Sequence, residues 1–322
     1  MQDEESWARE SLREIALEGI RERRRARRWG IFFKLLVLVY LGVLLAGVVL
    51  PGLQWGTESI AGPHTAVVKI HGPLMSDAQA SDERIIEGLE AAFAADNARG
   101  VLLDINSPGG SPVVSSRIYQ AIQRLRSAHP DKTVHAVAGD VMASGAYYIA
   151  AAADSIHVDG ASIVGSIGVV SRGFGLAEAI ERLGIERRIY TAGEEKAGLD
   201  PFTDPDSKEI NNLKIMLDKI HDQFIEAVEA GRGDRLAGDR EELFSGRIWT
   251  GAQSIENGLA DAFGSPGSVA RDVIGAAERI DYTPQRKLLE RALERVGAAA
   301  THSLRSLQQS PVSLSMSPVT AD

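Results

Sequence analysis

A serine flanked by small residues is the first feature of this sequence that could carry out chemistry. The stretch from Thr133 to Asp154 begins as an apolar strand over Val134 to Ala138. It turns through Gly139 and Asp140 and continues as an alanine-rich helix from about Ser144. At such a turn the hydroxyl is accessible, and the N–H groups of the first helical turn point at whatever it attacks. Serine is also a common helix N-cap, so the pattern is consistent with a nucleophile and with a cap.

A serine hydroxyl is a weak nucleophile unless a base and donors for the developing oxyanion lie nearby. The sequence has 7 histidines, of which His71 and His157, near the ends of predicted strands, remain candidates for the base. No aspartate has a recognisable triad spacing, and spacing alone would not reveal one. The GxSxG pattern is absent, because the residues read Met142-Ala143-Ser144-Gly145.

A lysine held neutral is the other known base for a serine. A lysine in this role needs its pKa lowered by roughly 3 units, which an apolar pocket can achieve. Lys196 lies in a glycine-containing loop from Thr191 to Phe202, whereas Lys208, Lys214 and Lys219 fall on polar positions of a predicted long helix. The simplest interpretation of Lys196 is an exposed loop lysine, so the residues alone do not assign the base.

The elements that must position these side chains alternate between strands and helices. This alternation predicts a largely parallel sheet covered by helices. The loop from Asn106 to Gly110 and the Ser144 turn both leave the carboxyl ends of strands, so we expect them to face one crevice. Strands are predicted over 66–70, 101–105, 134–138, 156–158 and 186–190, and helices over 81–95, 176–183 and 207–230.

Composition is that of a globular protein. The 322 residues are 44% hydrophobic and 25% charged, enough for one large domain or two small ones. The formal net charge of −9 argues against a nucleic-acid-binding protein. Because the chain has no cysteine, thiolate catalysis, disulfides and cysteine-ligated metals are excluded. We expect neither a metal nor a cofactor.

The N-terminal part predicts a membrane anchor. Residues 1–30 are highly charged and end in a basic cluster, and residues 31–50 are apolar with Lys34 as their single charge. At 1.5 Å per residue such a helix spans roughly 30 Å, the thickness of a bilayer core. No clear small-residue cleavage site follows, which favours a retained single-pass anchor over a cleaved signal peptide. The basic cluster predicts a cytoplasmic N-terminus, with the chain beyond about residue 52 outside the cytoplasm.

Three segments together resemble the serine–lysine signal peptide peptidases of the SppA type, whose fold is related to that of Clp protease and the crotonases. They are INSPGGS from Ile105 to Ser111, MASGAYYIAAAAD followed by GSIGVV, and the KAGLDPF loop with the segment from Gly246 to Asp261. Each is weak alone, but together their order and spacing are specific. The resemblance covers about residues 65–280. It follows a linker over 51–64 and precedes a predicted helix and disordered tail over 281–322.

The resemblance implies roles for five residues of this sequence. Ser144 is the implied nucleophile, Lys196 its general base, and Ser166 the hydroxyl that orients the lysine. The N–H groups of Gly110 and Gly145 are the implied oxyanion hole, which agrees with glycine in a loop and with the start of a helix. The implied fold class is α/β, Clp protease/crotonase-like, with repeated ββα/βαβ units and a parallel sheet, here preceded by one transmembrane helix.

The resemblance also implies an assembly. Short members of the family form ring-like homo-oligomers, such as an octamer, in which neighbouring protomers contribute the serine and the lysine. One departure concerns Glu194 and Glu195, which precede Lys196 and would favour its charged form if they pointed inward.

The sequence therefore predicts a serine endopeptidase in the inner (cytoplasmic) membrane, with its catalytic domain on the extracytoplasmic or periplasmic side. The expected substrates are apolar peptides such as remnant signal peptides, and the expected partners are the membrane and further copies of the chain, not nucleic acid. Two alternatives stay open. One is a non-catalytic membrane scaffold that binds peptides, and the other is a crotonase-type acyl-CoA enzyme, for which no phosphate-binding cluster is evident.

Overall fold

The computed structural model describes residues 29–42, 62–193 and 195–284. The chain divides into two compact units, one made of Met1–Ser59 with Arg286–Asp322 and the other of Ile60–Gln285. The second unit contains the whole of the predicted peptidase domain.

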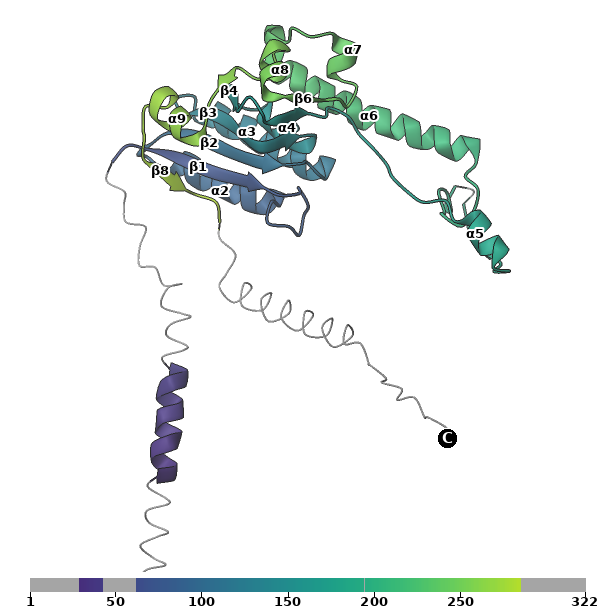
Figure 1. The fold of residues 1–322 in the computed structure, drawn as a ribbon, viewed down its shortest axis with the longest axis horizontal. Coiled ribbons are helices and arrows are strands. Elements are labelled where there is room, and N and C mark those ends of the chain that lie inside the picture. The colour runs from purple at the N-terminus through teal and green to yellow at the C-terminus, as the bar shows by residue number, and fades with distance from the viewer. Residues whose placement is uncertain (1–28, 43–61, 194, 285–322) are drawn as a thin grey trace, which may run out of the picture. The chain divides into compact units, whose positions relative to one another are not determined.

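A single sheet forms the centre of this second unit (Figure 1). Its path runs β6-β5-β3-β2-β1-β8, while β4 pairs with β3 and carries β7 on its other side. Every pair is parallel except β5 with β6, so the mostly parallel α/β architecture predicted from the alternating pattern is confirmed. The strands are β1 (His64–His71), β2 (Ala98–Ser107), β3 (Thr133–Ala143), β4 (Ser155–Val158), β5 (Ile163–Gly165), β6 (Ile248–Thr250), β7 (Ala262–Phe263) and β8 (Arg279–Asp281).

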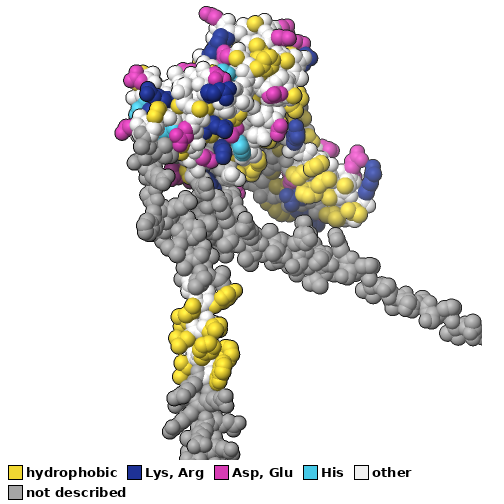
Figure 2. Space-filling model, turned by 60° about the vertical axis from the view of Figure 1, so that its left-hand side comes forward, with side chains coloured by type: hydrophobic (Ala, Val, Ile, Leu, Met, Phe, Trp, Pro, Cys, Tyr) yellow, Lys and Arg dark blue, Asp and Glu magenta, His cyan; other side chains and the backbone are white. Residues whose placement is uncertain are grey.

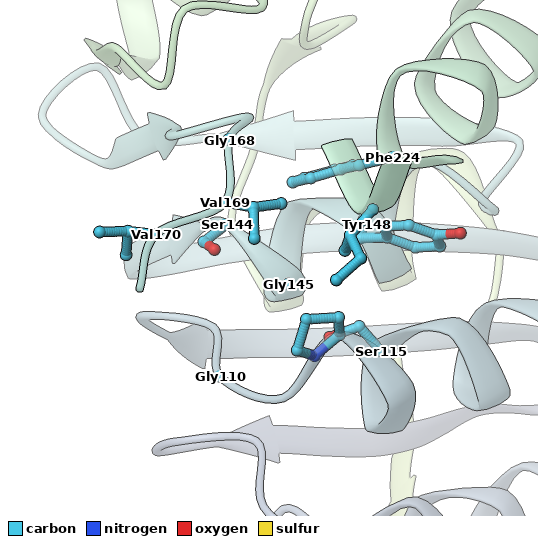
Figure 3. Close-up of a pocket in the computed structure, with 11 residues that line it drawn as sticks. Gly110, Ser115, Ser144, Gly145, Tyr148, Gly168, Val169, Val170 and Phe224 are labelled. Atoms are coloured by element: carbon cyan, nitrogen blue, oxygen red, sulfur yellow. The ribbon is translucent and has the colours of Figure 1, made fainter. Parts of the chain in front are cut away.

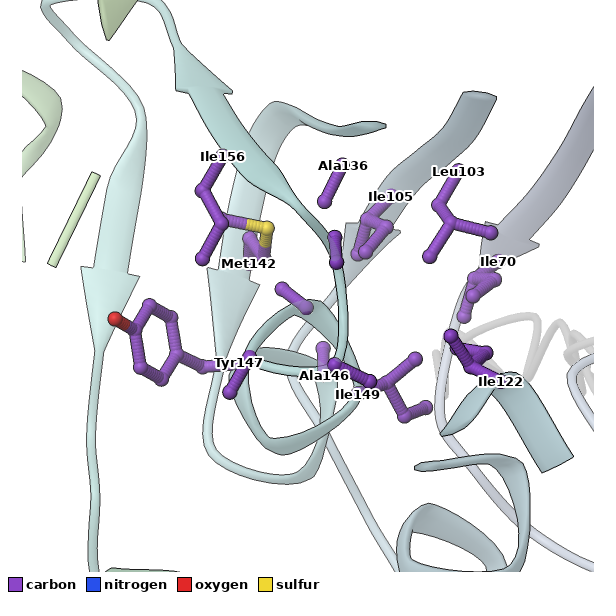
Figure 4. Close-up of a cluster of buried hydrophobic side chains, with 14 of the residues drawn as sticks. Ile70, Leu103, Ile105, Ile122, Ala136, Met142, Ala146, Tyr147, Ile149 and Ile156 are labelled. Atoms are coloured by element: carbon purple, nitrogen blue, oxygen red, sulfur yellow. The ribbon is translucent and has the colours of Figure 1, made fainter. Parts of the chain in front are cut away.

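Three helices supply most of the helical side chains of the main core, part of which is shown in Figure 4. Ile122 of α3 and Ile149 of α4 meet Ile70 and Ile105 of the strands, and all four side chains are fully buried. Burial of this kind contributes roughly 25 cal/mol per Å² of apolar surface and holds the carboxyl ends of β2 and β3 in place. The helices are α2 (Asp82–Ala94), α3 (Pro112–Ala128) and α4 (Gly145–Ala150).

A smaller cluster covers part of the opposite face. There Val67, Leu102 and Val137 of the three central strands pack against Val269. Val269 begins an irregular helical segment that precedes β8 in the chain. The elements of this region are α9 (Pro266–Ser268) and η2 (Val269–Val273).

β3 does not turn where the sequence predicts a turn. It continues through Gly139 and Asp140 to Ala143, pairing first with β2 and β4 and then, over its last residues, with β5. Asn106 lies where the register between β2 and β3 shifts, and its side-chain oxygen accepts the N–H of Val141 at 3.2 Å. The prediction was wrong because this side chain supplies the hydrogen bond that the shifted ladder lacks.

The chain then leaves the sheet as an arm, which we define as residues 171–206. Figure 1 shows the arm beyond the N-terminal end of α6 (Ser207–Arg232), the end remote from the sheet. A helix predicted over 176–183 is present as α5 (Ala177–Arg182). The strand predicted over 186–190 was wrong, because these residues are exposed and have no regular structure. An extended segment needs a neighbouring strand for its backbone groups, and the arm offers none among the described residues.

The arm is closed by its own contacts. Arg187 pairs with Asp200 at 3.1 Å and its guanidinium lies 5.6 Å from the ring centroid of Phe202. The N–H of Leu176 donates to the carbonyl of Pro201 at 2.6 Å, which joins the two ends of the arm. All of these contacts join residues of the arm to one another, so this closure is a local feature rather than an anchor to the sheet.

The carboxyl end of α6 is anchored by a buried arginine. Arg232 donates to both carboxylate oxygens of Asp261, at 2.7 and 2.9 Å, and to the carbonyl of Gly258 at 2.8 Å. Asp261 in turn accepts from the N–H of Ile156, so α6 is tied to β4. The remaining elements of this region are η1 (Gly233–Arg235), α7 (Arg240–Leu243) and α8 (Gly251–Glu256).

The predicted membrane span lies only partly within the described residues. A helix runs over 29–42, and its apolar side chains are exposed (Figure 2). Among the described residues, no helix combines the length and the hydrophobicity needed to cross a bilayer. The described residues therefore do not support the transmembrane helix predicted over 31–50, of which residues 43–50 lie outside them. Residues 51–61 of the linker predicted over 51–64, and residues 285–322 of the helix and tail predicted over 281–322, lie outside them as well.

Candidate active site

Ser144 stands between β3 and α4 in a strained backbone conformation. Its φ of 53° and ψ of −127° lie where residues with a Cβ are rarely found. Such a conformation costs about 1–3 kcal/mol and persists only where the surrounding structure enforces it. The enforcement comes from β5, because the N–H of Ser144 donates to the carbonyl of Gly165 at 2.8 Å. Ser144 is thus held at the carboxyl end of a parallel strand, where α/β sheets place their sites.

The hydroxyl of Ser144 does not cap α4. Ser144 occupies the N-cap position, but its side chain makes no capping hydrogen bond. Its backbone carbonyl accepts the N–H of Tyr148 at 3.0 Å. At the start of α3, in contrast, the side chain of Ser111 accepts the N–H of Val114. The cap interpretation of Ser144 was therefore wrong, and its hydroxyl has no structural task at the helix start.

The loop after β2 lies directly against Ser144. A Cβ added to Gly109 would be 2.8 Å from the Cβ of Ser144 and 2.7 Å from the backbone nitrogen of Gly145. A Cβ added to Gly110 would collide with the carbonyl oxygen of Leu74. Leu74 fixes the loop by donating to the carbonyl of Gly109 at 2.9 Å. This close approach of two backbones is the physical reason for glycine at both positions.

Two N–H groups beside Ser144 are suited to an oxyanion. The N–H of Gly145 lies in the first turn of α4, where a helix has no internal acceptor. The N–H of Gly110 has no acceptor among the described residues. The two groups are neighbours, since the nitrogen of Gly110 lies 3.4 Å from the place of a Cβ on Gly145. Paired donors next to a nucleophile can stabilise the charge of a tetrahedral intermediate.

An apolar pocket opens beside the hydroxyl of Ser144 (Figure 3). Its volume is about 130 Å³. It lies between the loop after β2, which contains Gly110, and α4, the segment after β5 and α6. A site of this size and character accepts a side chain of a peptide rather than a charged cofactor. The lining residues are Gly110, Pro112, Ser115, Ser144, Gly145, Tyr148, Gly168, Val169, Val170, Ile220 and Phe224.

Aromatic side chains form one wall of the pocket. The ring of Tyr148 lies 4.9 Å from that of Phe224 and 5.3 Å from that of Tyr119, centroid to centroid. Burial raises the pKa of the Tyr148 hydroxyl, so this group stays protonated at neutral pH. Tyr148 therefore packs against its aromatic neighbours and lines the pocket at once.

Ser166 shares the strained geometry of Ser144. Its φ is 54°, its N–H donates to the carbonyl of Arg247 at 2.8 Å, and its side chain is half-buried. The residue before it, Gly165, accepts the N–H of Ser144. The structure therefore brings the backbones of the two predicted serines together, at adjacent ends of β3 and β5.

Lys196 lies elsewhere. It belongs to the arm, its side chain is exposed, and it does not line the pocket of Ser144. The carboxylate of Glu195 contacts other groups, since it lies 2.8 Å from the amine of Lys208 and 3.3 Å from the amide of Asn212. This disfavours the sequence-based concern that Glu195 faces Lys196, while Glu194 lies outside the described residues. One chain alone does not bring the predicted base to the predicted nucleophile.

The two histidines kept as alternative bases have other partners. His157 binds the hydroxyl of Ser155 at 2.8 Å, and His135 binds the same hydroxyl at 2.7 Å. His71 lies on β1 at 3.4 Å from Asp104. Neither His71 nor His157 lines the pocket, and among the described residues no group of three or more His, Asp or Glu is arranged to hold a metal ion.

Sequence reasoning missed the contribution of α6 to the site. Ile220, Phe224 and His221 fall within the helix predicted over 207–230. In the structure the first two line the pocket and His221 hydrogen-bonds the segment after β5. No local signal separates these residues from other helix positions, because the contact joins segments more than 50 residues apart in the sequence.

Comparison with known proteins gives the family. Residues 126–275, from the end of α3 to the turn before β8, match the family described as Peptidase family S49. Residues 126–275 therefore form a domain of peptidase family S49. The matched stretch contains Ser144, Ser166 and Lys196, and the loop with Gly110 precedes it.

Similar proteins include several peptidases. A protein named as a signal peptide peptidase, SppA, from Enterococcus faecium is 34% identical over 52% of this chain and 47% of its own length. Protease 4 of Haemophilus influenzae is 30% identical over 62% of this chain and 32% of its own length. The resemblance of the S49 domain to the SppA type is thereby confirmed.

A further relative carries a different name. A protein of Brucella melitensis named Na(+)/H(+) antiporter NhaA is 42% identical over 72% of this chain, but the match covers 32% of that protein. This chain spans about a third to a half of the length of the three relatives described.

Proposed function

We propose that this chain is a membrane-anchored serine endopeptidase with a serine–lysine dyad. The observation that carries the proposal is Ser144 itself, held at a φ of 53° with an uncapped hydroxyl beside an apolar pocket. The neighbouring N–H groups of Gly110 and Gly145 supply the donors that acyl transfer requires. Membership of the S49 domain in a peptidase family supports the same reaction class.

The proposed reaction proceeds through an acyl-enzyme. Ser144 Oγ attacks the scissile carbonyl carbon while its proton passes to the neutral amine of Lys196. The oxyanion is held by the two glycine N–H groups, and the lysine then gives its proton to the leaving amine. A water molecule repeats the sequence on the ester and releases the acid, which regenerates the serine. Ser166 is proposed to orient the lysine amine by a hydrogen bond.

The lysine is proposed to come from a neighbouring copy of the chain. Within one chain the arm that contains Lys196 lies away from the sheet that carries Ser144 (Figure 1). A ring-like homo-oligomer, such as an octamer, would bring the arm of one protomer to the pocket of the next. Each site would then need two protomers, so activity would depend on assembly.

The proposed substrates are apolar peptides, remnant signal peptides among them. Support comes from the apolar lining of the pocket, which includes Val170 (67% exposed), and from Val113 (57% exposed), which follows the lining residue Pro112 in the chain. An extended peptide can also pair with a free strand edge near such a pocket. The apolar stretch of residues 31–50 is proposed to anchor the chain in the inner (cytoplasmic) membrane, with the N-terminus cytoplasmic and the catalytic domain outside the cytoplasm.

The strain at Ser144 also bears on the alternative of a non-catalytic scaffold. A scaffold gains nothing from a serine in a costly conformation, because glycine would adopt the same φ more readily. No observation on the described residues favours the acyl-CoA alternative. The pocket beside Ser144 is apolar and so does not suit a charged cofactor.

A mixing experiment tests the dyad and its division between protomers. Ser144→Ala and Lys196→Ala should each abolish cleavage of a fluorogenic apolar peptide. If the two inactive variants are mixed one to one, dissociated and reassembled, about a quarter of the sites combine an intact serine with an intact neighbouring lysine. We therefore expect about a quarter of wild-type activity.

The controls separate the parts of the proposal. Wild-type activity in either single variant would refute the dyad, whereas no recovery on mixing would place serine and lysine in one chain. Lys208→Ala is the matched lysine control. Lys208 lies in the first turn of α6 and pairs with Glu195, the residue before Lys196 in the arm. A lysine base also predicts that wild-type activity rises toward alkaline pH, where more of the amine is neutral.

A further inference from the structure

The segment that follows β5 forms part of the proposed site but is sparsely held. Ser166 begins it, and Gly168, Val169 and Val170 line the pocket beside Ser144 (Figure 3). Between Gly168 and Gly175 no hydrogen bond to a described residue holds the backbone. The next tie after Ile167 is the hydrogen bond from Leu176 to Pro201, inside the arm.

Four contacts fix the segment at its start. The N–H of Ser166 donates to the carbonyl of Arg247, and the side chain of Ile167 is fully buried in the core. Gly168 packs on Gly246, where an added Cβ would be 3.0 Å from the neighbouring Cα. The fourth is a hydrogen bond of 3.1 Å between Nε2 of His221 and the carbonyl of Ile167.

The hydrogen bond from His221 defines the orientation of a peptide plane within the site. A carbonyl oxygen can only accept, so Nε2 of His221 must carry the proton, in the neutral tautomer or in the imidazolium. Because the peptide bond is planar and trans, fixing the oxygen of Ile167 also fixes the direction of the N–H of Gly168. Rotation of this plane would displace Ser166, which is proposed to orient the lysine. It would also displace residues 168–170, which form the pocket wall.

His221 is well placed to hold that plane. It is half-buried on α6, next to Ile220 and one turn before Phe224, both of which line the pocket. Phe224 is 4% exposed, and the buried residues of α6 begin there, so His221 lies at the edge of the anchored half of the helix. An imidazole at this position couples a rigid helix to a segment that has few other hydrogen bonds.

We propose that His221 is a positioning residue of the peptidase site, acting through the carbonyl of Ile167 to set Ser166 and the pocket wall of residues 168–170. The proposal rests on the proposed function, since it assigns His221 to the same reaction. His221 does not touch the reacting atoms, and both of its protonation states donate the hydrogen bond.

The test uses the full chain and three variants of one residue. The amide nitrogen of His221→Gln can occupy the place of Nε2, that of His221→Asn is one bond too short, and His221→Leu has no donor. Activity is measured as kcat and KM on a fluorogenic apolar peptide. The number of reactive sites is measured by labelling Ser144 to completion with a fluorophosphonate. Dividing kcat by this number gives kcat per labelled site. We expect His221→Leu and His221→Asn to lose about tenfold or more in kcat per labelled site, as misplaced catalytic groups do. His221→Gln should keep most of the activity.

The controls distinguish positioning from stability and from the reaction itself. Gln223→Leu changes an exposed residue of the same helix and should leave kcat per labelled site unchanged. A purely structural role would lower the number of labelled sites and the melting temperature while kcat per site stayed at the wild-type value, and this would overturn the proposal. Equal activity of the Leu and Gln variants would overturn it as well. Cleavage by Ser144→Ala would instead refute the proposed function, whatever His221 does.

Discussion

At the scale of single residues, backbone strain distinguishes Ser144 from an ordinary helix cap. Three residues other than glycine have a positive φ among those described, and two of them are Ser144 and Ser166. The resemblance in sequence implies a function for both residues. Strain at a residue without a structural task favours a chemical role, because the fold must offset its cost elsewhere.

The strain at Ser144 predicts an unusual stability order. Replacing Ser144 by Ala keeps a Cβ at a φ of 53°, whereas replacing it by Gly removes the clash. We expect the Gly variant to be about 1 kcal/mol more stable than the Ala variant, although neither can cleave peptides. Urea unfolding of the two variants measures the difference. An Ala variant as stable as the Gly variant would show that the conformation is not strained.

At the scale of secondary-structure elements, two features build the site. β3 changes partners midway, which ends its first pairing with β2 and aligns Ala143 with Gly165 of β5. α6 returns from the arm and closes the pocket with Ile220 and Phe224. The first feature depends on one side chain, Asn106, and the second on contacts between distant segments, so neither follows from periodicity.

The pairing of β3 with β4 carries a pH-dependent contribution. His135 and His157 are buried and share the hydroxyl of Ser155. Burial lowers the pKa of both side chains, and for His135 the neighbouring His157 lowers it further. Their pKa values in the folded state therefore lie below those of the unfolded chain, so the unfolded state binds more protons at mildly acidic pH.

The contribution of these two histidines to the free energy of unfolding should be fully present above the ordinary histidine pKa of about 6.5 and should be lost as pH drops through and below it. We expect a lower urea midpoint at pH 5 than at pH 7.5. Replacing both His135 and His157 by Asn removes the titrating groups and should reduce this difference, even if the variant is less stable at every pH. An unchanged difference in the double variant would assign the pH dependence to other groups.

At the scale of the whole molecule, the arm presents apolar surface to solvent. Phe174 is 84% exposed and Tyr190 is 90% exposed, and apolar side chains gather on this part of the surface (Figure 2). Soluble proteins seldom expose large apolar side chains in groups unless another surface covers them. This feature supports the proposed assembly, in which the arm that carries Lys196 meets a second copy of the chain.

The proposed assembly predicts that arm residues control activity without controlling folding. Replacing Phe174 and Tyr190 by Ser should reduce the oligomer mass in analytical ultracentrifugation and lower peptidase activity in parallel. The melting temperature of the sheet domain should stay close to wild type, because these side chains bury almost no surface within one chain. Phe263→Ser is the matched control, since Phe263 is 63% exposed but lies on β7, outside the arm. Full activity in an arm variant that remains monomeric would contradict the assembly.

The local pattern by itself determined the parallel α/β class, most strands and helices, and the loop and turn that meet at Ser144. These features follow from the spacing of apolar residues and from the positions of glycines. Both signals report on the structure of only a few neighbouring residues. Resemblance assigned Lys196 and Ser166, since no pattern in the residues distinguished this lysine from the others.

The tertiary structure alone decided the rest. It replaced the turn at Gly139 by a continuous strand, left residues 186–190 without a neighbouring strand among the described residues, and showed that the Ser144 hydroxyl does not cap α4. It also brought α6 to the pocket and separated Lys196 from Ser144 within one chain. The physical reason is common to all of these. Each depends on which segments distant in sequence come into contact, and side-chain periodicity carries information about the face of an element but not about its partner.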